Sequence, residues 1–99
     1  GLSEDEEHPT SQYRGVTWSK RSGKWQVQMG ATKAGKDTLW LGYFDFENEE
    51  GAARTYDRGQ IAYLGRKEAV TNFPLEQYAH ELDWLEGLEG GVIEFAARV

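Results

Sequence analysis

The chain has 99 residues, enough for one domain with a small core, and its formal net charge is −6. It has no cysteine, which excludes disulfides, cysteine-ligated zinc and a thiol nucleophile. Its apolar runs are a few residues long, too short for a membrane-spanning helix or the apolar part of a signal peptide. We expect the sequence to be a domain of a longer protein.

The charge is unevenly distributed along the chain. Residues 13–44 carry six basic side chains against one acidic side chain, Asp37, whereas residues 1–12 and 74–99 are acidic. Nucleic acid is bound by the charge of one face rather than by the total charge. An acidic chain can therefore still present a basic binding surface.

Residues 1–11 are polar and acidic and predict a disordered lead-in. Three segments with alternating side chains follow, at residues 13–19, 24–30 and 38–44, and each predicts a short strand. Because the connections between them are short, we expect an antiparallel meander. The residues that we expect on its apolar side are Trp25, Val27, Met29, Leu39, Leu41 and Tyr43. In the first strand, Arg14, Val16 and Trp18 share one side.

The next segment predicts an α-helix over residues 49–64. Asn48 is a suitable N-cap, and Gly65 is a natural residue after the last turn. We expect a stripe that includes Ala52, Tyr56 and Gly59 to pack on the sheet, and Arg54, Asp57 and Arg58 to be exposed. The predicted fold is α+β, with a three-stranded antiparallel sheet packed against one α-helix.

Residues 75–99 are acidic, and the spacing of their apolar side chains predicts an amphipathic helical tail. We expect Phe73 to close the end of the core. The tail is expected to dock on the domain's own helix; contact with the basic sheet face, as self-inhibition, is the alternative. The predicted docking stripe is Leu75, Tyr78, Ala79, Leu82 and Leu85.

Catalysis is not indicated. His8 and His80 are far apart in sequence and have no neighbouring nucleophile, and scattered acidic residues predict no metal site. We therefore expect neither an enzyme nor a cofactor.

The polar side of the predicted sheet is the candidate binding surface. A sheet of two or three strands fits the major groove of B-DNA, which is about 12 Å wide. Basic side chains suit phosphates and guanine, glutamine suits adenine, and an exposed tryptophan can lie on sugar and backbone. The residues of this kind are Arg14, Lys20, Arg21, Lys24, Gln26, Gln28 and Trp40.

The blocks "YRGVTWSKRSGKWQVQM", "LWLGYF", "EEGAARTYDRGQIAYLG" and "AVTNFP" occur in this order. Together they resemble the Apetala-two/ethylene-responsive-factor (AP2/ERF) DNA-binding domain of plants and algae, over residues 12–74. The residues after "NFP" are similar to the Apetala-two-like branch. The resemblance implies a three-stranded sheet in the major groove with one helix packed behind it.

The resemblance also implies individual contacts. It makes Arg14 a DNA contact from the first strand, and it adds Thr38 to the candidates Lys24, Gln28 and Trp40. Thr17 and Trp18 stand where the family usually carries arginine, and both are included as candidate contacts. For binding by charge we expect Arg14, Lys20, Arg21, Lys24 and Lys36; for base discrimination, Arg14, Gln26, Gln28 and Trp18.

The sequence thus predicts a nuclear transcription factor that binds double-stranded DNA, with no membrane and no small-molecule substrate. With so few cations, we expect the single domain to bind DNA modestly. A second DNA-binding domain or a protein partner would raise the affinity for DNA. Two other classes stay open: a protein-interaction module that uses the acidic tail, and a DNA-targeting domain of a larger nuclease.

Overall fold

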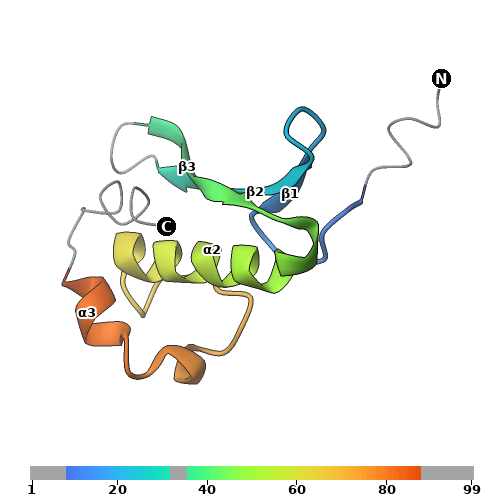
Figure 1. Ribbon diagram of the computed structural model, residues 1–99. Coiled ribbons are helices and arrows are strands. Elements are labelled where there is room, and N and C mark those ends of the chain that lie inside the picture. Colours follow the sequence, from blue (N-terminus) through green and yellow to red (C-terminus); the bar gives the residue numbers. More distant parts are fainter. Residues whose placement is uncertain (1–8, 32–35, 88–99) are drawn as a thin grey trace.

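The computed structural model describes residues 9–31 and 36–87, without the side chains of residues 31, 36 and 37. Three strands come first and a long helix follows (Figure 1). The elements are β1 (Val16–Ser19), β2 (Lys24–Ala31), β3 (Lys36–Phe44), the 3-10 turn η2 (Phe46–Asn48), α2 (Glu49–Leu64), the 3-10 turn η3 (Leu75–Tyr78) and α3 (Leu82–Glu86).

The three strands form one antiparallel sheet in the order β1-β2-β3, and α2 packs on one of its faces. The predicted α+β fold is confirmed. Gly59 brings the helix close to the sheet, because a Cβ atom there would lie 2.6 Å from Cδ1 of Leu41. The buried residues on the sheet side of this core are Val16, Trp25, Val27, Met29, Leu39 and Leu41.

The helix has the predicted bounds, Glu49 to Leu64. At its end, Gly65 has a φ of 85° and its N–H donates to the carbonyl of Ile61. Asn48 occupies the N-cap position, but its side chain makes no capping hydrogen bond. The 3-10 turn η2, which runs directly into α2, takes the place of a capped start.

The expectation that Tyr43 faces the core is wrong. Val27 pairs with Gly42, while the next residue, Gln28, pairs with Trp40, so Leu41 is an extra residue in β3. Such a β-bulge shifts the alternation of the strand by one position. Tyr43 consequently lies opposite Gln26, with 56% of its surface exposed.

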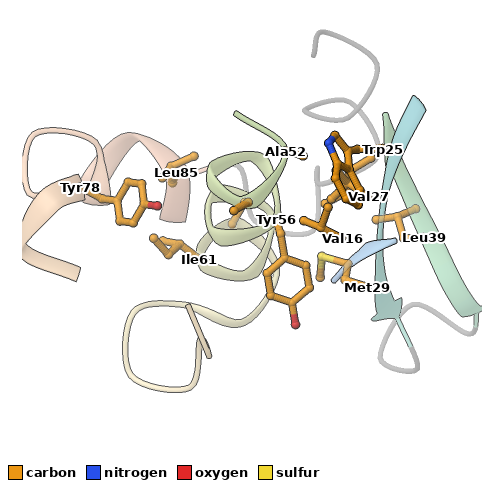
Figure 2. Packing of buried hydrophobic residues seen from close by; sticks show 13 residues of the cluster. Val16, Trp25, Val27, Met29, Leu39, Ala52, Tyr56, Ile61, Tyr78 and Leu85 are labelled. Carbon is orange, nitrogen blue, oxygen red and sulfur yellow. The ribbon is translucent and has the colours of Figure 1, made fainter. Parts of the chain in front are cut away.

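The expectation that Asp57 is exposed is also wrong, since its side chain is fully buried. The helix is covered on two sides: the sheet lies on one, and the segment after the helix lies on the other (Figures 1 and 2). On this second side Ile61 of α2 belongs to the same apolar cluster as Tyr78 and Leu85. Periodicity identified only the side of α2 that meets the sheet.

The described part of the tail docks on α2, as predicted, but it is not one helix. A 3-10 turn, η3, is followed by a turn and then by the five-residue α3, and Ala79 is exposed rather than buried. Tyr78 and Leu85 are fully buried. Residues 88–99, which the prediction included in the helical tail, lie outside the described residues.

Ion pairs fasten the tail to the end of α2 and to the residues after it. Arg58 binds Glu81, with Nε and Oε1 2.7 Å apart. Arg66 binds Glu86 through its side chain and also through its backbone N–H, which is 2.7 Å from Oε2. These hydrogen bonds from Arg66 lower the pKa of Glu86 from 4.5 to about 2.

This shift predicts a pH dependence of stability. Because the pKa of Glu86 is lower in the folded protein, its contribution is fully present above pH 4.5 and is lost as the pH falls toward 2. The free energies of unfolding of the native protein and of Glu86→Gln should therefore converge over this range. Urea unfolding at a series of pH values measures the difference; a constant difference from pH 6 to pH 2 would contradict the role given to Glu86.

Candidate nucleic-acid interface

The face of the sheet opposite α2, called the outer face below, carries polar and aromatic side chains. Strand pairing places Thr17 opposite Gln26, Gln26 opposite Tyr43, and Gln28 opposite Trp40. Trp40 and Tyr43 have 53% and 56% of their surface exposed. The outer face consists of Thr17, Ser19, Lys24, Gln26, Gln28, Thr38, Trp40 and Tyr43.

Hydrogen bonds orient two side chains of the outer face, Gln26 and Lys24. Nε2 of Gln26 donates to Oγ1 of Thr17 at 3.2 Å, which leaves the amide oxygen of Gln26 as an acceptor toward a ligand. Nζ of Lys24 lies 2.7 Å from Oδ1 of Asp45, and this hydrogen bond lowers the pKa of Asp45. Asp45 carries no local signal in the sequence, although it neutralises Lys24, the cation among the outer-face residues.

Trp18 does not share the outer face. It packs edge-on against Trp25, with ring centroids 5.1 Å apart, and against Phe46 at 6.0 Å. Pro9, Thr10 and Ser11, which belong to the predicted disordered lead-in, line a surface pocket together with Trp18. Residues 1–8 of the lead-in lie outside the described residues.

Arg14 is exposed, but it lies before β1 rather than in it, because the strand begins at Val16. Gly15 intervenes with a φ of 81°, which breaks the extended backbone. Its carbonyl still accepts from the N–H of Gln28 at 3.0 Å, so Arg14 stands at the end of the sheet. The backbone of Arg14 is held by Asn72, a residue that sequence reasoning did not single out.

The remaining candidate cations lie at the two ends of the sheet. Lys20 and Arg21 are exposed in the turn between β1 and β2, which is closed by a hydrogen bond from Gly23 N–H to the carbonyl of Ser19. The backbone of Lys36 pairs with Ala31 at the opposite end of the sheet, and the Lys36 side chain lies outside the described part. The candidate residues thus divide into the outer face, the cations at its ends, and Trp18 on the core side.

Tyr43 is the outer-face residue that strict alternation missed. The signal in the sequence was Gly42, because glycine inside a strand often marks a bulge. Asp45, Asp57 and Asn72 carried no comparable local signal, since each acts through a partner that is distant in the sequence.

The described residues hold no group of three or more His, Asp or Glu side chains that could bind a metal ion. None of the helices in this part of the chain is long and apolar enough to cross a membrane.

Comparison with known proteins gives a consistent family, although no family model matches the chain. The chain is 49% identical over 69 residues to APETALA2-like protein 2 of Oryza sativa subsp. japonica. It is 44% identical over 68 residues to the AP2-like ethylene-responsive transcription factor PLT2 of Arabidopsis thaliana, and 34% identical over 85 residues to the AP2-like ethylene-responsive transcription factor At1g79700 of the same plant.

These matches cover 70%, 69% and 79% of this chain, but only 15%, 11% and 27% of the respective relatives. The chain therefore spans less than a third of the length of the curated relatives it matches. The chain belongs to the AP2/ERF domain family.

Proposed function

We propose that this chain is the DNA-binding domain of a nuclear plant transcription factor, and that its outer face enters the major groove of double-stranded DNA. The observation that carries the proposal is the division of the sheet into two faces. One face is buried under α2. The outer face presents amides and hydroxyls, together with two exposed aromatic rings that lie opposite the glutamines of β2. The names of the relatives, which are transcription factors, support the same function.

The outer face suits the chemistry of base edges. Glutamine amides offer the paired donor and acceptor that adenine presents in the major groove, and arginine suits guanine. Gln26 and Gln28 lie on the central strand, β2. Arg14 lies at the end of the sheet, next to Gly15, whose carbonyl accepts from the N–H of Gln28. Trp40 and Tyr43 flank the two glutamines from β3, where their rings can pack against sugars or thymine methyl groups.

The cations supply affinity that does not depend on sequence. Arg14, Lys20, Arg21, Lys24 and Lys36 would displace counterions from phosphates, which makes binding salt-dependent. The far side of α2 contributes little, because Arg54, Arg58 and Arg66 are paired with carboxylates there. No catalytic role is proposed for this domain, whose proposed role is to bind DNA.

Selection from a random duplex library, read at two salt concentrations, tests the function. We expect an enriched sequence motif, and the logarithm of the observed binding constant should fall against log salt with a slope of about −3 to −5, from about four to six phosphate contacts. Enrichment of no motif would reject sequence-specific binding. Binding that does not change with salt would reject the electrostatic contribution.

Two single variants separate base reading from charge. Arg14→Ala should change the enriched sequence, because it removes a side chain suited to a base edge. Asp45→Asn frees Lys24, so it should raise affinity for all duplexes alike and steepen the salt slope by up to about 0.9. The same selection, repeated with each variant, measures both effects; an unchanged motif for Arg14→Ala would show that this residue does not read bases.

A further inference from the structure

One amide side chain holds both backbone groups of Arg14. The N–H of Arg14 donates to Oδ1 of Asn72 at 2.7 Å, and Nδ2 of Asn72 donates to the carbonyl of Arg14 at 3.1 Å. These two residues are 58 positions apart in the sequence. The contact therefore ties the start of the sheet to the loop that follows α2.

Asn72 is itself held by the buried carboxylate of Asp57. Oδ1 of Asp57 accepts from the backbone N–H of Asn72 at 2.6 Å and from its Nδ2 at 3.2 Å. Oδ2 accepts from the backbone N–H of Phe73 at 3.0 Å. The amide of Asn72 is consequently fixed in orientation, with its oxygen turned toward the N–H of Arg14.

The fourth hydrogen bond to Asp57 comes from the tail. The hydroxyl of Tyr78 donates to Oδ2 at 2.5 Å, and both side chains are fully buried. A carboxylate has about four acceptor positions, so this hydroxyl completes the set. Burial and the contact with Asp57 raise the pKa of Tyr78, which keeps the hydroxyl protonated as a donor.

We propose that Tyr78 is a positioning residue for DNA recognition: through Asp57 and Asn72, its hydroxyl holds the backbone of Arg14 where the Arg14 side chain meets the duplex. The inference rests on the proposed function of the outer face. The tail docks on the side of α2 away from the sheet (Figure 2). The proposal gives this tail a role in DNA recognition. The link consists entirely of hydrogen bonds among four residues: Arg14, Asn72, Asp57 and Tyr78.

Tyr78→Phe is the appropriate variant because it removes the hydroxyl and retains the ring that packs in the core. Its first readout needs no DNA: hydrogen exchange of the Arg14 amide, whose N–H is bound to Asn72. We expect this amide to exchange faster by about three- to tenfold, with Gly23 N–H, which is bonded within the β1–β2 turn, unchanged. Equal exchange of the Arg14 amide in both proteins would overturn the proposal.

The second readout is a double-mutant cycle in binding to the selected duplex. Tyr78→Phe should weaken binding by about three- to tenfold in the native background, and it should have no further effect once Arg14→Ala is present. With Lys24→Ala the two effects should multiply, because Lys24 is held by Asp45 and not by this network. Multiplication with Arg14→Ala as well would overturn the proposal and reduce Tyr78 to a structural residue.

The cycle also separates this proposal from the proposed function. If the native protein binds the selected duplex and Arg14→Ala leaves the affinity unchanged, the positioning role is rejected while DNA binding stands. If no duplex is selected, the proposed function fails and the DNA-reading role of Tyr78 fails with it, whatever the exchange rate of the Arg14 amide. Glu86→Gln, which removes the ion pair of the tail with Arg66 and touches none of these four residues, is the matched control and should leave the Arg14 amide unaffected.

Discussion

Replacing Asp57 by alanine should lower the free energy of unfolding by about 3–5 kcal/mol. The carboxylate is fully buried and accepts four hydrogen bonds. Its removal leaves the N–H groups of the half-buried Asn72 and Phe73 and the buried hydroxyl of Tyr78 without this acceptor. Each unsatisfied group costs about 1–3 kcal/mol, and water that enters the vacated space recovers part of the loss.

Two variants bracket this result. Asp57→Asn keeps a carbonyl acceptor and should lose less stability than Asp57→Ala. Glu50→Ala, on the same helix, removes a side chain that is 63% exposed and paired with Arg54, and should change stability by less than about 1 kcal/mol. Urea unfolding followed by tryptophan fluorescence compares all three; a loss for Asp57→Ala as small as that for Glu50→Ala would show that the buried carboxylate is not structurally important.

Gly15→Ala should lower the free energy of unfolding nearly as much as Asp57→Ala, by about 2–5 kcal/mol. A Cβ atom on Gly15 would overlap the ring of Tyr56, and the φ of 81° is unfavourable for any residue with a side chain. Overpacking of this kind costs about 1–3 kcal/mol, and the left-handed backbone about 1–2 kcal/mol more. The ring of Tyr56 cannot move away easily, because it is buried between α2 and the sheet.

Gly23→Ala is the matched control for this substitution. Gly23 has a similar φ of 66°, but nothing lies within 4 Å of a Cβ atom built there. The stability of Gly23→Ala should therefore fall only by the cost of the left-handed backbone, about 1–2 kcal/mol. Thermal unfolding of both variants isolates the steric contribution as their difference; equal losses would mean that Tyr56 yields to the new methyl group.

Much of the fold could be predicted from local sequence patterns. The alternation in residues 24–30 and the helical signals between Asn48 and Gly65 identified β2 and α2, because both depend on residues that are close in the sequence. The side of β2 that carries Gln26 and Gln28 followed from the same alternation. The charge pattern likewise showed that residues 13–44 are net basic within an acidic chain.

The candidate site could be predicted only in part, for two physical reasons. The bulge at Leu41 and Gly42 interrupts the alternation of β3, and so it moved Tyr43 from the predicted core to the outer face. Trp18 has the core-side parity of Val16, and its packing on Trp25 and Phe46 depends on residues beyond its own strand. Resemblance to a family identifies positions, but it does not say toward which side a particular side chain turns.

The sequence by itself determined the three strands, the long helix and the polar character of one sheet face, because periodicity and capping act within a few residues. Only the tertiary structure decided that Asp57 is buried and that Asn72 holds Arg14. Those features join residues that are 15 to 58 positions apart, and no local pattern records such contacts. The basic strand region is therefore visible in the sequence, while the hydrogen bonds that position Arg14 arise from folding.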